Sequence, residues 1–120
     1  NNTSTTFFTL KSEDVDGIVL HWKEHHYHND SSDFLKLDQE SLKEFIEDFN
    51  QFEVNDELHL VNKCYELLIN YVDGTTEIFD FDGHRVISRI NGHHYACIDQ
   101  ENLITKFWNI TEKDFCVKHE

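Results

Sequence analysis

Apolar and polar residues alternate along the N-terminal part of the chain, and a period of two is typical of β-strands that bury one face. In residues 17–27, the apolar positions Ile18, Leu20 and Trp22 lie on one side of the predicted strand. The neighbouring segments complete the region: a short edge strand over residues 7–10, a turn rich in Asn, Asp and Ser over residues 28–33, and a return strand over residues 34–37. We therefore expect a β-hairpin here.

The period changes to that of an amphipathic helix over residues 38–49. Its apolar positions follow the spacing i, i+3, i+4 and i+7: Leu42, Phe45, Ile46 and Phe49. Asp38 is the expected N-cap, and Ser41 with Glu44 offers a capping box. The following residues, 51–62, are ambiguous between a loop and a strand extension.

Alternation returns in the second half of the chain, interrupted by turns that contain glycine. The predicted strands cover residues 64–72, 75–82, 85–90 and 93–98, separated by Asp73-Gly74, Gly83-His84 and Asn91-Gly92. Such turns predict a four-strand antiparallel meander, and we expect positive φ at both Asp73 and Gly74. A second helix opens at Asp99, with this apolar face: Leu103, Ile104, Phe107, Trp108 and Ile110.

These elements predict one α+β domain over residues 7–120, preceded by a polar leader over residues 1–6. The expected architecture is an antiparallel sheet built from a β-hairpin, a helix, a four-strand meander and a C-terminal helix, with both helices packed on one face. The helices should meet Tyr65, Leu67 and Ile69, or the neighbours of these residues on the opposite face of the strand. Replacing Phe45 with alanine should then cost roughly 3–5 kcal/mol.

The net charge of the chain limits the classes of macromolecule that it can bind. The chain carries 24 acidic and 10 basic residues, a net charge of −14, which repels nucleic acid and anionic membranes and attracts basic proteins. The acids concentrate between residues 38 and 57, where they form either a solvated face or a surface that docks a basic partner. The candidate partner-binding residues are Glu40, Glu44, Glu47, Asp48, Asp56 and Glu57.

The cysteines indicate the compartment. Cys64, Cys97 and Cys116 follow no metal or redox spacing, so we expect mostly reduced, buried thiols and a cytoplasmic protein, with a Cys64–Cys97 bridge as the alternative. No apolar run reaches the roughly 18 residues that a membrane span needs. The chain begins at Asn1 and contains no Met, so a cleaved export signal and tethering at the cell surface form the alternative localisation.

Residues 21–30, "HWKEHHYHND", contain four of the nine histidines. On a strand, His26 and His28 share one side and are the candidate ligands of a zinc, nickel or copper ion. A stable metal site needs three or four ligands. We therefore expect these histidines to lie on an exposed strand face without a cofactor, and the metal site is the alternative.

Catalytic motifs are missing from the sequence. It has no G-x-S-x-G elbow, no glycine-rich phosphate loop and no cysteine within a recognised signature. Cys97 is expected as a small buried hydrophobic residue. Acid pairs such as Asp80 and Asp82 are expected by chance in so acidic a chain. We therefore expect no enzyme and no catalytic residues.

The stretch "YELLINYVDGTTEIFDFDGHRVISRINGHHYACIDQENLITKFW" resembles the C-terminal half of small uncharacterised α+β domains of low-GC Gram-positive bacteria. Many of these relatives are exported lipoproteins, and the resemblance extends over residues 34–110. It is a pattern of hairpins and therefore implies no functional residue.

The sequence thus favours a non-enzymatic acidic protein that neutralises or docks a basic protein partner, as immunity and inhibitor proteins do. The alternatives are an exported, tethered domain with an unknown ligand and a histidine-based metal-binding protein. A meander also exposes edge strands, so a homodimer formed by strand pairing is a further expectation.

Overall fold

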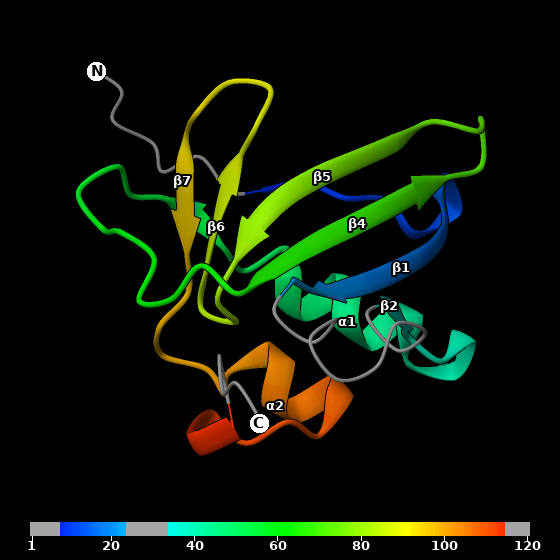
Figure 1. Cartoon of the computed structure of the whole chain (residues 1–120). Helices are drawn as coiled ribbons and strands as arrows, with labels where there is room; N and C mark the ends of the chain where they lie inside the picture. The colour runs from blue at the N-terminus through cyan, green and yellow to red at the C-terminus, as the bar shows by residue number, and fades with distance from the viewer. Residues whose placement is uncertain (1–7, 24–33, 115–120) are drawn as a thin grey trace.

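The computed structural model of the protein describes residues 8–23 and 34–114. The protein consists of a seven-stranded antiparallel sheet with helices on one of its faces (Figure 1). The strands are β1 (Val15–Trp22), β2 (Phe34–Lys36), β3 (Glu53–Val54), β4 (Tyr65–Tyr71), β5 (Thr76–Phe81), β6 (Arg85–Ser88) and β7 (His94–Ala96). The helices are α1 (Leu42–Phe49) and α2 (Leu103–Trp108), with 3₁₀ turns η1 (Ser12–Asp14), η3 (Gln39–Ser41) and η4 (Glu112–Asp114). The predicted α+β class is confirmed.

The strands follow the order β2-β1-β4-β5-β6-β7-β3. The predicted hairpin of β1 with β2 and the meander from β4 to β7 are both present and antiparallel. The ambiguous stretch after α1 contributes the two-residue strand β3, which pairs with β7 at the far edge of the sheet. The rest of that stretch is a loop, so the expected order gains one short strand.

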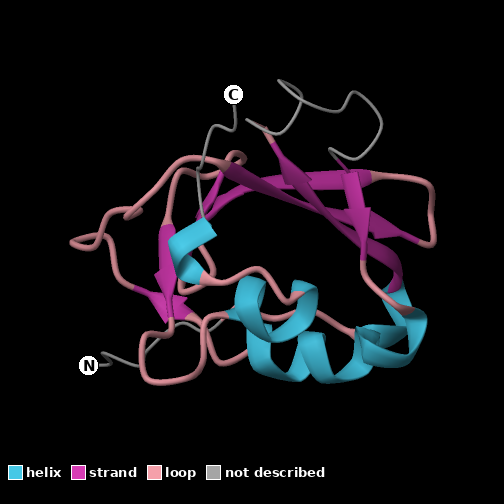
Figure 2. Ribbon diagram, turned by 60° about the horizontal axis from the view of Figure 1, so that its bottom comes forward, coloured by secondary structure: helices cyan, strands magenta, loops and turns pink. Residues whose placement is uncertain are grey.

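The core lies between the inner face of the sheet and the two helices (Figure 2). Strand register aligns Leu20, Leu67 and Phe79 across three neighbouring strands, and all three side chains are fully buried. Phe45 and Phe49 of α1 are buried against them, as the helical spacing predicts. The expected contact of both helices with one face of the sheet is therefore confirmed.

Residues 8–10 form no strand, so the predicted edge strand over 7–10 is wrong for the residues described. The backbone N–H of Phe8 donates to the carbonyl of Phe52 at 2.7 Å. Leu10 pairs instead with a side chain: its N–H donates to Asn50 Oδ1 at 2.7 Å, and Asn50 Nδ2 donates to its carbonyl at 2.8 Å. The Asn50 side-chain amide thus makes the two backbone hydrogen bonds to Leu10 that a neighbouring strand would otherwise make.

Helix starts differ from the expected caps. Neither Asp38 nor Ser41 makes a side-chain capping bond, so the predicted capping box does not form. The 3₁₀ turn η3 separates Asp38 from α1, and Ser41 has helical dihedrals where a capping residue is usually extended. The second helix begins at Leu103, after the N-cap Asn102, and not at Asp99.

The turn at Asp73-Gly74 also differs from the prediction. Gly74 has a φ of 92°, but Asp73 has no positive φ. Instead, the Asp73 carboxylate accepts hydrogen bonds from Thr75 N–H at 2.9 Å and Thr75 Oγ1 at 2.6 Å. Tyr71 N–H donates across the turn to Thr75 O at 2.8 Å, so the connection spans one residue more than a two-residue turn.

The cysteine predictions are wrong in part. Cys64 is disulfide-bonded and Cys97 is a free, half-buried thiol, which excludes the Cys64–Cys97 bridge and the reduced state expected for Cys64. Burial raises the pKa of the Cys97 thiol, which is the behaviour of a structural thiol. Cys116 lies outside the described residues.

Among the residues that the structure describes, no helix is long and apolar enough to cross a bilayer.

Both edges of the sheet are short, with three residues in β2 and two in β3. At the β2 edge, the carbonyl of Leu35 accepts a hydrogen bond from Trp108 Nε1 of α2 at 2.9 Å. Within the described part of the chain, β2 and β3 therefore offer few backbone groups for strand pairing with another chain, and the homodimer stays a prediction.

Candidate functional site

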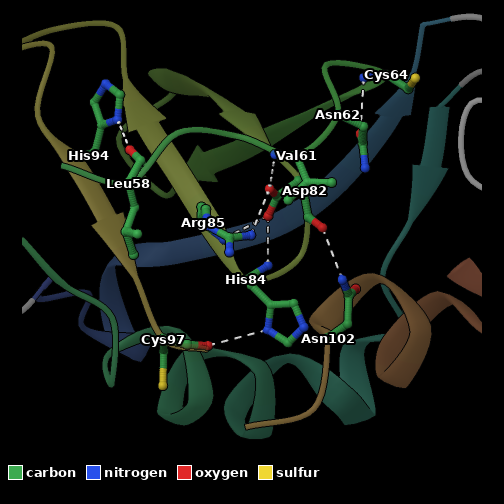
Figure 3. A network of polar contacts seen from close by, with 10 residues as sticks. All are labelled: Leu58, Val61, Asn62, Cys64, Asp82, His84, Arg85, His94, Cys97 and Asn102. Carbon is green, nitrogen blue, oxygen red and sulfur yellow. Dashed lines mark hydrogen bonds and ion pairs between the residues drawn. The ribbon is translucent and has the colours of Figure 1, made fainter. Parts of the chain in front are cut away.

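The turn between β5 and β6 centres on the buried carboxylate of Asp82, which is 2% exposed. Its Oδ1 accepts from the backbone N–H groups of His84 at 3.0 Å and Arg85 at 2.9 Å (Figure 3). Its Oδ2 accepts from Val61 N–H at 2.8 Å and from Arg85 Nη1 at 3.2 Å. Each oxygen thus has two donors, and the carboxylate ties the long loop after β3 to this turn.

Gly83 connects the turn to α2. Its carbonyl accepts from Leu103 N–H at 3.0 Å, and Asn102 Nδ2 donates to the carbonyl of Asp82 at 3.0 Å. Asn102 Oδ1 caps the helix by accepting from the backbone N–H groups of Ile104 at 2.8 Å and Thr105 at 3.3 Å. One asparagine therefore holds both the helix start and the turn.

Replacing Gly83 with alanine should lower the free energy of unfolding by about 2–3 kcal/mol. The φ of Gly83 is +98°, and an added Cβ would lie 2.0 Å from Asn102 Oδ1. The substitution would therefore add backbone strain and force Asn102 out of its capping position. Chemical denaturation followed by circular dichroism measures the loss.

Gly74 provides the matched control, because its φ is +92° and nothing lies within 4 Å of an added Cβ. Gly74→Ala should cost about 1 kcal/mol, the backbone strain alone. Equal losses for the two variants would mean that the contact between Gly83 and Asn102 is unimportant.

A cavity of about 440 Å³ opens beside this turn. Its walls come from the loop after β3, the β5–β6 turn, the α2 N-cap and η4: Val61, Asn62, Asp82, His84, Arg85, Asn102 and Glu112. His84 Nδ1 lies 3.4 Å from the carbonyl of Cys97, and Figure 3 shows its second ring nitrogen pointing away from Cys97. This volume falls in the range of small-ligand sites.

The acidic residues predicted on the first helix lie on its outer side and just before it. Glu40 and Glu47 are exposed, whereas Glu44 and Asp48 lie 3.1 and 2.7 Å from Lys106 Nζ of α2. The hydrogen bonds to Asp48 and Glu44 raise the pKa of Lys106. Lys106 thus partly neutralises this surface.

Asp56 and Glu57 do not join that surface. They lie in the loop after β3, which runs beside β7, whereas α1 lies under β4 and β1 (Figure 1). Asp56 accepts from His94 N–H at 2.8 Å and lies 3.2 Å from His93 Nδ1; the backbone bond from His94 lowers the pKa of Asp56 most strongly. Asp56 therefore holds its own loop against β7, while Glu57 is exposed.

The predicted metal ligands, His26 and His28, lie outside the described residues. His21, the first histidine of the same stretch, pairs through Nδ1 with Glu66 at 2.9 Å and stacks on the ring of Phe34. Over residues 8–23 and 34–114, no three or more metal-ligating side chains are close enough to share an ion. Metal binding therefore stays a prediction that rests on the sequence.

The uncovered face of the sheet carries an ion cluster that the sequence analysis missed. Arg89 bonds to Glu66 and lies 2.7 Å from Asp80, which register places opposite Glu66. Burial raises the pKa of Glu66, but the hydrogen bonds from His21 and Arg89 outweigh it and hold that pKa below its usual value. These charges pair with one another, so the cluster stabilises the sheet.

Comparisons of the chain with protein-family models, curated proteins and solved structures find no match. The resemblance to Gram-positive domains and any function that it implies thus stay predictions.

Proposed function

We propose that this protein is a non-enzymatic binding protein that docks a basic protein partner through the outer side of α1 and η3. The surface consists of Glu40, Glu44, Glu47 and Asp48. One observation carries the proposal: in the described chain, Glu40 and Glu47 are exposed and pair with no basic side chain. A basic partner would supply the missing counter-charges.

The partial neutralisation by Lys106 refines the proposal. Glu44 and Asp48 share one lysine, so two carboxylates still face one positive charge. Lys106 also fixes both side chains in place, which reduces the entropy that binding would cost. The net charge of −14 speeds the approach of a basic partner from a distance.

The disulfide at Cys64 bears on localisation. Disulfides persist in oxidising compartments and are rare in the cytosol. Because Cys64 is disulfide-bonded, we favour export over the cytoplasm as the localisation of this binding protein.

The test removes four charges from α1 and η3 together: Glu40→Gln, Glu44→Gln, Glu47→Gln and Asp48→Asn. With a lysine 20-mer as the basic probe, calorimetry at physiological salt should show binding weakened by roughly tenfold, which corresponds to about 1.4 kcal/mol.

The matched control removes four exposed carboxylates elsewhere: Glu13→Gln, Glu53→Gln, Glu57→Gln and Glu101→Gln. Its net charge equals that of the α1 variant, so it should weaken binding by less than about threefold if the site is local. Equal weakening of both variants would reduce the effect to net charge and contradict the proposed surface. Circular dichroism of both variants checks that the fold is retained.

A further inference from the structure

The cavity beside the β5–β6 turn has polar groups that folding does not use. Asp82 is fully bonded, but the Glu112 carboxylate is exposed and no basic side chain of the described chain pairs with it. Asn62 Oδ1 accepts one hydrogen bond, from Cys64 N–H at 3.2 Å, and no other described residue donates to its second lone pair. No described residue bonds the second ring nitrogen of His84, Nε2, which is an acceptor when Nδ1–H donates to the Cys97 carbonyl.

The charges of the wall select the ligand. Arg85 and Asp82 form an ion pair at 3.2 Å and offset one another, so among the described wall residues Glu112 leaves an excess of negative charge. The field of a chain with net charge −14 adds to this excess. Phosphate and carboxylate ligands are therefore disfavoured, and a cation is favoured.

The shape of the site suits a long side chain. Val61, which is 76% exposed, lies on the wall and offers apolar surface to an aliphatic stem. Arginine and lysine side chains combine such a stem with a charged end, and they bury the stem while the end finds polar partners. The walls are also rigid, because Asp82 and Asn102 bond three of the four contributing segments together.

We propose that this cavity binds one arginine or lysine side chain of the basic partner, with Glu112 as the counter-ion and with His84 Nε2 and Asn62 Oδ1 as hydrogen-bond acceptors. The cavity would add specificity to the charge attraction of α1, since it recognises one side chain by shape. The proposal rests on the proposed function for the source of the ligand, but the binding site is separate from α1.

The test is an NMR titration with Nα-acetyl-arginine methylamide at physiological salt. Amide shifts should be largest at residues 61–62, 84–85 and 112, with millimolar affinity for so small a ligand. The matched compound Nα-acetyl-citrulline methylamide has the same shape without the charge and should bind at least fivefold more weakly. Equal binding of the two compounds would overturn the proposal.

Two protein variants complete the test. Glu112→Gln should weaken binding of the arginine compound at least fivefold, whereas Glu101→Gln, an exposed glutamate outside the cavity wall, should leave it unchanged. Unchanged binding to Glu112→Gln, or shifts confined to α1, would overturn the proposal. The variant with four substitutions in η3 and α1 should bind the arginine compound as the unmodified protein does. The experiment therefore distinguishes a wrong proposal for the cavity from a wrong proposal for the α1 surface.

Discussion

Replacing Phe45 with alanine should lower the free energy of unfolding by roughly 3–5 kcal/mol. Phe45 is fully buried, and its ring lies 5.6 Å from that of Phe49, 5.2 Å from Phe107 and 5.7 Å from Trp108. The substitution leaves a cavity at the contact between the two helices, where rigid rings cannot move in to fill it. Chemical denaturation gives the loss as a shift in midpoint.

Phe34→Ala is the matched control, because it removes the same side chain from a position that is 59% exposed. Phe34 stacks on His21 at a ring distance of 4.2 Å, so its loss should cost about 1 kcal/mol. If Phe45→Ala cost no more than Phe34→Ala, the helices would not pack on the sheet as described.

Replacing Asp82 with alanine should also cost roughly 3–5 kcal/mol, through a different mechanism. The substitution leaves the N–H groups of Val61, His84 and Arg85 without their acceptor, and it removes the counter-charge of the Arg85 guanidinium. Unsatisfied donors and an unpaired, largely buried charge are both expensive. Denaturation at neutral pH measures this loss.

Asp80→Ala tests the same residue type two positions earlier. The Asp80 side chain is 30% exposed and pairs with Arg89, which keeps Glu66 as a partner. Its loss should cost less than about 1 kcal/mol, as for other partly exposed ion pairs. A large loss at Asp80 together with a small loss at Asp82 would contradict the roles assigned to the two carboxylates.

Much of the fold could be predicted because hydrophobic period and turn chemistry agree along the chain. The alternation from Tyr65 to Ile69 and the glycines at the turns predict the strands that form β4 to β7. The stripe containing Phe45 and Phe49 predicts which side of α1 is buried. These signals are local, so no tertiary information is needed to interpret them.

The helix starts could not be predicted with the same success, because several residues near each start can cap equally well. Asp38, Ser41 and Asp99 all have suitable side chains, yet Asn102 is the residue that caps α2. The choice depends on the tertiary contact with Gly83, which residue type alone does not show. An asparagine directly before the apolar pair Leu103-Ile104 was the available signal.

The candidate site was predictable in part. Acidic residues on α1 are visible in the sequence, but Lys106 is 58 residues from Asp48, so their pairing depends on the fold. In an unbroken strand, Asp80 and Asp82 would share one side. The chain leaves β5 at Phe81, and the turn at Gly83 then directs Asp82 into the protein.

The position of α2 has a consequence for how the protein opens. Its N-terminus is bonded to the β5–β6 turn through Asn102, and its C-terminal Trp108 donates to Leu35 in the edge strand β2. If α2 detached, the β5–β6 turn and strand β2 would both lose a hydrogen-bonded partner at the same time. Amide hydrogen exchange in β2 and in the β5–β6 turn should therefore report one cooperative opening unit, although the two segments lie far apart in the sequence.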